Sequence, residues 1–413
     1  MTERHSRACA VVAAVLTGAL ALGAPPRAVA QSPDTLLNGR GVSTVGPVYE
    51  SWSLGGGGVW QPDPLGADSV LVRRVSQWSI PVSVVVPIGA HWTVDAAGAY
   101  AHGTVELNGP DTTLGTSRYQ LNGITDVQMR LVGRLAGDNL LLTFGVNAPS
   151  GKTSLSDAEF KALRIIAAPA FGMTSPQLGT GFGAIAGVVA ARQWGAWSWA
   201  AGASYQMRRS YVPIATLAEA AGPDFRPGNA TRFSIGADRL LGQSALTVRV
   251  SAEVYQHDQL TLATTGGQTI NSSVQLGPTF STDWRLLIAS RSIKDFTLRA
   301  IYTYRSSFKR EGSAVPGSSG QYTWVDLHGL IPVGERTSIL TEVSGVYQTG
   351  LNVNTSLAAA GMTSGGLTLG LAQRMGSFQL TPFVRGQVGR LDTGAQKATA
   401  TQYAAGVSMA LRY

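Results

Sequence analysis

The sequence predicts an all-β protein: a closed antiparallel transmembrane β-barrel of about 16 strands, with 14 as the alternative count. Three observations predict it. Apolar and polar residues alternate along many segments, and short turns alternate with long polar loops. The chain also begins with a secretory leader, yet no run of 18 apolar residues follows it. An exported membrane protein without spanning helices must be a closed barrel, because backbone groups in hydrocarbon find no water to pair with.

The first thirty residues have the parts of a secretory signal peptide. A positive start precedes an apolar run, and Ala28-Val29-Ala30 forms a small-residue cleavage site. We expect residues 1–30 to be removed, residues 31–41 to form a short N-terminal segment and residues 42–413 to form the barrel. The single cysteine, Cys9, would leave with the leader, so no disulfide is expected in the mature chain.

Composition favours a membrane partner over nucleic acid. The chain carries a formal charge of +8, which falls to +6 without the leader, but no run of five like charges appears. A basic balance indicates nucleic acid when the charges form such a block, and here they do not. Only 14% of the residues are charged. We therefore expect outer-membrane lipids, and no nucleic acid, as partners.

The C-terminal segment alternates most clearly. Tyr403, Leu411 and Tyr413 belong to one face, and Gln402 and Arg412 belong to the other. Successive strand side chains point to opposite faces, so this segment has one apolar and one polar side. A chain that ends on an aromatic residue of the apolar face has the signature by which outer-membrane barrels are recognised for assembly. We therefore expect the barrel-assembly machinery to bind the strand that ends at Tyr413.

The same alternation recurs in residues 127–135, 197–206, 246–254 and 296–305. In a soluble sandwich the apolar face would point inward, whereas in a membrane barrel it meets lipid and the polar face lines the lumen. The alternation alone does not choose between the two. The leader, the terminal aromatic residue and the pattern of loops choose the barrel.

Two kinds of connection alternate along the chain. Short turns fall near Gly89, Gly137, Gly195, Gly242, Ile293, Glu335 and Gly376. Longer loops fall near residues 55–68, 108–118, 149–177, 211–229, 257–269, 309–321, 349–361 and 390–398. Outer-membrane barrels have short periplasmic turns and longer external loops. Both chain ends are therefore expected on the periplasmic side. The alternative of 14 strands remains because residues 42–54 and 361–375 alternate weakly.

Placing the apolar face outward puts charged residues in the lumen. The lumen-lining candidates are Arg130, Arg134, Arg208, Arg249, Glu253, Arg299, Arg305 and Arg385, with Arg232, Asp126 and Asp238 beside them. A surplus of arginines in a confined passage would attract anions. Alternatively, these arginines pair with acids across the strands and brace the wall. Ion selectivity separates the two hypotheses.

The longest loop contains a helix signal. Ser156 followed by Glu159 matches a capping box, in which the two side chains satisfy the free backbone donors at a helix start. Phe160 and Leu163 then recur at helical spacing. This constriction helix either folds inward and narrows the pore or caps the external rim. A second candidate helix runs from residue 214 to residue 221.

Aromatic residues also indicate a membrane. Trp92, Trp194, Trp197, Trp284 and Trp324 lie near predicted strand ends. Amphipathic rings collect where the hydrocarbon meets water, so these tryptophans are predicted to form aromatic girdles. The alternative is that they are ordinary strand residues.

Signals for enzymatic chemistry are weak, and we expect no catalytic residues, no metal site and no cofactor. Gly242-Gln243-Ser244 lacks the closing glycine of a nucleophile elbow. Asp326 and His328 lie two apart and therefore share a strand face, which leaves an outer-membrane hydrolase as an alternative. The remaining histidines are scattered without metal-ligand spacing.

Two stretches resemble a known family. Residues 82–100 look like the strand–turn–strand opening of the outer-membrane transporters linked to the meta-pathway of phenol degradation. Gly123-Ile124-Thr125-Asp126-Val127, followed by Asn147-Ala148-Pro149-Ser150-Gly151-Lys152, resembles that family's "glycine-x-glycine-aspartate-valine … proline-threonine-glycine" stretch. Here Thr125 replaces the second glycine and Ser150 replaces the threonine. The resemblance covers about residues 75–210.

That family is distantly similar to the long-chain fatty-acid transporters, although residues 31–41 are too short for their N-terminal hatch. The resemblance implies a barrel that admits hydrophobic or aromatic small molecules. The sequence thus predicts an outer-membrane channel for passive or substrate-biased passage of small molecules in a Gram-negative bacterium. Alternatives are a general porin for hydrophilic solutes with mild anion preference, and an outer-membrane hydrolase or structural surface protein. A homo-oligomer is a further alternative to a single barrel.

Overall fold

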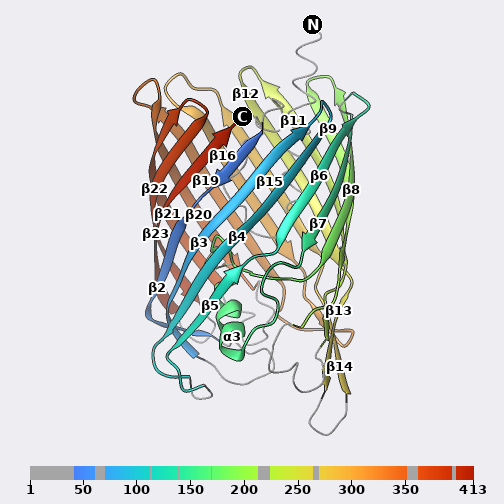
Figure 1. The fold of residues 1–413 in the computed structure, drawn as a ribbon, viewed down its shortest axis with the longest axis vertical. Helices are drawn as coiled ribbons and strands as arrows, with labels where there is room; N and C mark the ends of the chain where they lie inside the picture. The colour runs from blue at the N-terminus through green and yellow to red at the C-terminus, as the bar shows by residue number, and fades with distance from the viewer. Residues whose placement is uncertain are drawn as a thin grey trace.

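The computed structural model describes residues 41–60, 70–111, 114–137, 139–168, 170–212, 224–263, 269–350, 361–392 and 397–413. These residues form a closed antiparallel β-barrel (Figure 1). The predicted signal peptide and the candidate helix at residues 214–221 lie outside the described residues. Of the segment 31–41, only Gly41 is described.

The barrel has 16 strands, as predicted, and two of them are interrupted. In order they are β1 with β2 (Val42–Val45 and Val48–Trp60), β3 (Val70–Ile88), β4 (Trp92–Leu107), β5 with β6 (Arg118–Ile124 and Val127–Leu135), β7 (Leu140–Ala148), β8 (Gly183–Trp194), β9 (Trp197–Arg208), β11 (Ala230–Leu241), β12 (Ser244–Tyr255), β15 (Thr279–Ile288), β16 (Lys294–Arg305), β19 (Gly320–Pro332), β20 (Thr337–Thr349), β21 (Gly361–Met375), β22 (Phe378–Asp392) and β23 (Lys397–Arg412). Each strand pairs with its neighbours in the chain, which keeps the connections local.

The barrel closes between its first and last strands. β23 pairs with β22 on one side and with β1 and β2 on the other. At the seam the backbone N–H of Gly41 donates to Tyr413 O (2.9 Å), and that of Tyr413 donates to Gly41 O (3.0 Å). A Cβ at Gly41 would collide with the ring of Tyr413. The glycine therefore lets the final aromatic ring lie directly over the seam.

The outer face of the wall is apolar, and the inner face is mostly polar. On β3, Val82, Val86 and Ile88 are exposed, whereas Gln77 and Ser79 point inward and are buried. The outer apolar run from Trp78 to Ile88 measures about 33 Å along the strand, or about 25 Å in height at the usual strand tilt. This height matches the hydrocarbon band of outer-membrane barrels. The protein is an outer-membrane barrel whose apolar side chains meet lipid.

The two ends of the barrel differ. Short connections such as those at Gly89 and Gly242 lie at the end that carries Gly41 and the C-terminal Tyr413 (top of Figure 1), and the strand ends that border the long connections lie at the other end. We call these the short-turn end and the long-loop end. Gly89 and Gly242 have φ values of 65° and 66°, which favour glycine in tight turns.

Additional elements lie at the long-loop end. A small second sheet contains β10 (Asp224–Arg226), β13 (His257–Ala263), β14 (Thr269–Gln275), β17 (Lys309–Arg310) and β18 (Ser313–Ala314). The β13–β14 hairpin extends beyond the barrel rim (Figure 1). A helix, α3 (Asp157–Ile166), lies in the connection between β7 and β8. In the described part of the chain, no helix has both the length and the apolarity to cross a membrane.

Candidate functional site

The lumen is shaped by an inner loop, which we define as the described residues 149–168 and 170–182 and which carries α3. This loop leaves the wall where β7 ends at Ala148 and rejoins it where β8 begins at Gly183. α3 contacts β3, β4 and β5 (Figure 1). The inner loop therefore lies against the inner side of these strands at the long-loop end.

A buried apolar cluster holds the inner loop against the wall. Ile165 and Ile166 of α3 and Phe171 of the following turn are fully buried, together with Trp52 of β2. A Cβ at Gly103 of β4 would collide with Ile166, so the absence of a side chain there makes room for the helix. Burying three such side chains contributes several kcal/mol, at about 1.5–3 kcal/mol each.

Hydrogen bonds from the wall fix the segment after α3. The indole N–H of Trp52 donates to Phe171 O (2.8 Å). The Gln77 amide donates to Ser175 O (2.7 Å) and accepts from Ser175 N (2.9 Å). One carboxylate oxygen of Glu50 accepts from both the backbone N and the hydroxyl of Thr174, each at 2.7 Å. Buried donors and acceptors of the inner loop are thereby satisfied by the barrel wall.

Asp126 joins the two ends of the inner loop to the wall. It is 5% exposed and lies at the break between β5 and β6. Its Oδ1 accepts from Gly151 N (2.9 Å), and its Oδ2 accepts from Thr180 N (2.6 Å) and Asn147 Nδ2 (2.9 Å). Its own N–H donates to Leu178 O (2.8 Å). Sequence reasoning placed Asp126 among the lumen acids, but its carboxylate is used to hold the loop.

The two halves of the motif that carries the family resemblance meet at this point. Ser150 Oγ accepts from Val127 N (2.8 Å), and Thr125 Oγ1 accepts from Ala99 N (2.8 Å). A Cβ at Gly151 would lie 2.7 Å from Asp126 N, which is too close for any side chain. The motif therefore serves to dock the inner loop: Ser150 binds the wall at Val127, while the side chain of Thr125 bonds to the neighbouring strand β4.

The predicted helix is present, with its capping box. Ser156 Oγ accepts from Glu159 N (3.4 Å), while Ser156 N donates to Glu159 Oε2 (3.1 Å). Phe160 and Leu163 are half-buried against the apolar cluster. Of the two placements considered from the sequence, the contacts put α3 against the inner face of the wall rather than over the rim.

A buried ion pair on α3 was not found from the sequence. Lys161 is 8% exposed, and its Nζ lies 2.7 Å from Asp111 Oδ2. The hydroxyl of Tyr119 donates to the same carboxylate. Asp111 lies 50 residues before Lys161 in the connection between β4 and β5, so no local pattern joins them. The pair orients the helix, because a lysine that lost this partner would be left buried and unpaired.

The helix start should loosen in acid. Burial disfavours the charge on Glu159, but the Lys152 ammonium and the Ser156 donors outweigh it, so the pKa of Glu159 lies below its usual 4.5. An acid with a lowered pKa adds stability above its usual pKa, and this stability is lost as the pH falls through the folded value. Amide hydrogen exchange in α3 should therefore accelerate between neutral pH and about pH 3.5, after correction for the intrinsic rate. In the Glu159→Gln variant, amide exchange in α3 should already be faster at neutral pH and should change less with pH. An equal change with pH in the variant and the wild type would contradict the prediction.

The predicted lumen-lining residues all lie on the inner face of their strands, opposite exposed apolar neighbours such as Met129 and Val250. Three of them pair with acids. Arg130 Nε lies 2.7 Å from Asp95 Oδ2. Arg299 binds Asp283 through two hydrogen bonds of 2.7 and 3.0 Å. Arg385 Nη2 lies 3.7 Å from Glu342 Oε2, and its Nε donates to Thr368 (2.9 Å). These three arginines brace the wall across neighbouring strands.

The other predicted residues make different contacts. Arg134 donates to Ala90 O (3.1 Å) near a short turn. Arg208 donates to Gln206 (2.8 Å), and Glu253 lies half-buried opposite Arg232 in the strand register. Arg134 therefore lies at the short-turn end, whereas Arg208, Arg232 and Glu253 lie nearer the long-loop end of their strands.

Arginines concentrate on one side of the lumen. We define the arginine wall as the inner-face arginines of β9, β11, β12, β15 and β16, namely Arg208, Arg232, Arg249, Arg285, Arg299 and Arg305. The same inner faces carry three acids, which are Asp238, Glu253 and Asp283. β15 lies halfway round the barrel from β3, so the arginine wall faces the inner loop across the lumen.

Sequence reasoning missed two members of this region, Arg285 and Asp283. Both residues are next to Trp284, which is exposed on the outer face. Because neighbouring strand residues point to opposite faces, the alternation around Trp284 predicts that Asp283 and Arg285 face the lumen. Arg285 and Arg299 lie opposite each other in the register. Within the described residues, Nε and Nη2 of Arg305 are buried without a hydrogen-bond partner.

The prediction that Trp324 belongs to the aromatic girdle is wrong. Trp324 points into the barrel, because it shares a face with Asp326 while Val325 and Leu327 are exposed outside. The guanidinium carbon of Arg299 lies 5.7 Å from the centre of its ring, a cation–π contact. Trp324 is therefore a lumen residue.

The Asp326–His328 pair belongs to the same inner face. His328 Nδ1 lies 2.6 Å from Asp326 Oδ2, and Asp326 is 2% exposed. Asp326 also lies opposite Arg299 in the register. In the part of the chain that the structure describes, no group of three or more His, Cys, Asp or Glu side chains is placed to hold a metal ion. The pair is part of the charged wall network.

An apolar strip interrupts the polar lining. Val132, Leu141, Val189, Ala191 and Ala200 point inward from β6, β7, β8 and β9 and are buried against one another. They lie near the short turns of these strands. Barrel interiors are usually polar, so this strip is an exception in the lining.

No family model matches the sequence, and no curated protein matches it. Among solved structures, the chain is similar to the TodX deltaS2S3 mutant monoaromatic hydrocarbon channel, with 10% identity, 91% of each chain covered and a TM-score of 0.43. It is also similar to OprB of Pseudomonas putida (11% identity, 93% of this chain and 96% of that chain, TM-score 0.45). A third is OccK1 (OpdK) of Pseudomonas aeruginosa (10% identity, 90% and 99%, TM-score 0.41). At these identities and TM-scores the likeness concerns the fold alone.

Proposed function

We propose that the protein is a passive outer-membrane channel for small solutes, with a mild preference for anions. The observation that carries this proposal is the arginine wall, which holds six arginines against three acids. Surplus positive charge in a confined, low-dielectric passage raises the local concentration of anions. Arg305 contributes to this surplus, and its buried Nε and Nη2 have no hydrogen-bond partner among the described residues.

The inner loop is the proposed constriction. It occupies the side of the lumen that faces the arginine wall, so a solute would pass between α3 and the arginines. Ser156 and Glu159 would hold the helix in shape, while Phe160 and Leu163 would seat it on the wall. The long-loop end is taken as external, following the usual arrangement of such barrels.

A second candidate is the passage of hydrophobic or aromatic compounds, which the family resemblance implies. One observation favours it, the apolar strip formed by Val132, Leu141, Val189, Ala191 and Ala200. Such a strip would make the inner side of the wall less polar near the short-turn end. Liposome swelling with neutral sugars, carboxylated aromatics and uncharged aromatics separates the two candidates. Faster entry of uncharged aromatics than of either other class would favour the second.

Neutralising part of the arginine wall should reduce anion preference. In a planar bilayer with a salt gradient, the wild-type reversal potential should indicate anion preference, and the Arg232→Gln/Arg285→Gln variant should lower the anion-to-cation permeability ratio about twofold or more. Both residues lie on the inner face of the arginine wall.

The matched control for this test is Arg192→Gln. Arg192 is exposed on the outer face of β8, so its loss removes a charge without touching the lumen. Clear cation selectivity of the wild-type channel would overturn the anion preference. An unchanged ratio in the double variant would show that the arginine wall does not set selectivity.

A further inference from the structure

A group of arginines lies on the outside of the barrel, near the long-loop end. We define the rim arginine patch as Arg73 and Arg74 of β3, Arg118 of β5 and Arg390 of β22. The side chains of the first three are 60%, 43% and 56% exposed, and Arg390 is also exposed. Three of them lie opposite outer-face residues in the register: Arg74 opposite Ser53 and Glu106, Arg118 opposite Glu106, and Arg390 opposite Thr399. Arg73 lies where the register between β3 and β4 shifts, and its ion pair with Glu106 puts it on the same face.

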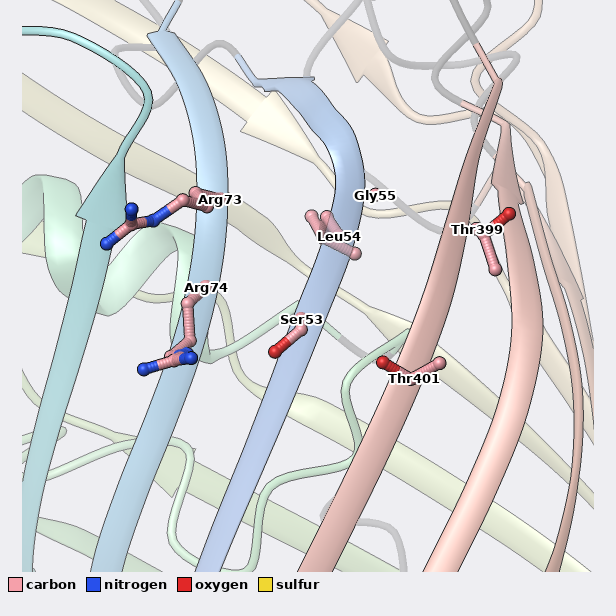
Figure 2. A pocket seen from close by; sticks show the side chains of 7 residues that line it. All are labelled: Ser53, Leu54, Gly55, Arg73, Arg74, Thr399 and Thr401. Atoms are coloured by element: carbon pink, nitrogen blue, oxygen red, sulfur yellow. The ribbon is translucent and has the colours of Figure 1, made fainter.

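A hollow adjoins the rim arginine patch. It has a volume of about 340 Å³, and its polar lining comes from Ser53, Thr399, Thr401, Arg73 and Arg74. Figure 2 shows the two arginines reaching to one side of the strand that carries Ser53, while the two threonines lie on the other side.

The hollow follows from a local irregularity of the wall. The register between β2 and β3 shifts between Ser53 and Gly58. Within this shift Gly56 and Gly57 have φ values of 79° and 81°. Only glycine adopts this conformation readily, and such a bulge bends the strand and opens space beside it.

The rim arginine patch lies just beyond the predicted hydrocarbon band, on the side of the long-loop end. Two aromatic pairs mark the edge of the band on the same strands, Trp78 with Tyr100 (5.9 Å) and Tyr49 with Tyr403 (5.8 Å). Arg74 is four residues beyond Trp78, which is about 13 Å along the strand and about 10 Å in height. At this height the guanidinium groups reach the headgroup layer rather than bulk water or the lumen.

Among the residues that the structure describes, the charge of the patch is not balanced by its neighbours. The acid within it is Glu106, whose carboxylate lies 2.7 Å from Arg73, 3.3 Å from Arg118 and 3.9 Å from Arg74. The nearby Asp392 pairs with Lys397 at 3.6 Å and adds no net charge. Within the described part of the chain, four arginines against one carboxylate leave a surplus of three positive charges facing the lipid headgroups. Arginine forks match phosphate oxygens in geometry as well as in charge.

We propose that the rim arginine patch binds the phosphate groups of a phosphorylated glycolipid of the outer leaflet. The guanidinium groups bind the phosphates, the hydroxyls of Ser53, Thr399 and Thr401 bind the adjacent sugar, and the acyl chains lie along the aromatic pairs. This site is on the outside of the wall and does not depend on what the lumen transports.

The test compares lipid binding by the intact barrel and by the Arg73→Gln/Arg74→Gln/Arg118→Gln variant. Purified protein is titrated with diphosphorylated lipid A, with the same lipid after phosphate removal, and with inorganic phosphate, and bound lipid is counted by native mass spectrometry. We expect the intact barrel to bind diphosphorylated lipid A at least about tenfold more tightly than the dephosphorylated lipid, with binding that weakens as salt is raised. The variant should lose most of this difference.

Arg192→Gln is again the control, because it removes an outer-face arginine near the short-turn end. The heat-dependent gel mobility of each variant reports whether the barrel is folded. Equal binding of phosphorylated and dephosphorylated lipid by the intact barrel would overturn the proposal, whatever the variant does. Displacement of the lipid by inorganic phosphate at comparable concentration would also overturn it, since the site would then hold free phosphate. Retention of full lipid binding by the folded triple variant would place the lipid elsewhere.

Discussion

Replacing Asp126 with alanine should release the inner loop and raise the single-channel conductance about twofold or more. The carboxylate accepts hydrogen bonds from Gly151, Thr180 and Asn147, which lie at both ends of the loop. Hydrogen bonds to a charged group contribute about 1.5–3 kcal/mol each, and their loss leaves buried donors unsatisfied. The measurements are conductance in a planar bilayer and trypsin cleavage within the loop, where Lys152 and Arg164 offer sites.

The control is Asp392→Ala, which removes a carboxylate that is 41% exposed at the barrel rim. It should leave both conductance and trypsin protection unchanged. If the loop of the Asp126→Ala variant stays protected and the conductance does not change, the apolar cluster alone holds the loop. If trypsin cleaves the loop but conductance stays constant, the inner loop does not form the constriction.

Deleting Tyr413 should lower the amount of folded barrel in the outer membrane about tenfold. The residue makes the last two backbone hydrogen bonds of the seam with Gly41, and its ring covers the space above that glycine. The expected loss has two sources, weaker closure of the barrel and loss of the aromatic end proposed to be bound by the assembly machinery. Heat-dependent gel mobility of membrane fractions measures the folded amount.

Refolding in detergent without the assembly machinery separates these two sources. If closure dominates, the deletion lowers the refolding yield as well, whereas a normal yield in detergent assigns the defect to recognition. Tyr413→Phe keeps the ring and should behave like the wild type in both measurements. A deletion variant that assembles normally in cells would contradict both explanations.

The sequence predicts the faces of this barrel well because strand side chains have a period of two. Arg130, Arg249 and Arg299 fall on the inner face for that reason, and their exposed neighbours fall on the outer face. The start of α3 can also be predicted from the sequence, because its capping box involves only Ser156 and Glu159, which are three residues apart. Trp324 was placed outside from its position near a strand end, although the alternation around it already indicated the inner face.

The remaining features depend on contacts between distant residues. The inner loop docks where β5 and β6 are separated at Thr125 and Asp126. The alternation of apolar and polar residues does not predict whether the loop lies inside or outside the barrel. The Asp111–Lys161 pair joins segments 50 residues apart. The arginine wall is a property of five neighbouring strands together, so it emerges only when their inner faces are added.

The apolar cluster beneath α3 has a consequence for biogenesis. Besides the helix and Phe171, it contains Trp52 from the first spanning strand, Leu391 from the fifteenth and Ala400 from the last. The apolar cluster therefore contacts both the first and the last strand, which must pair to close the barrel. We therefore expect the inner loop to be in place before the first and last strands pair, because the loop packs against both of them.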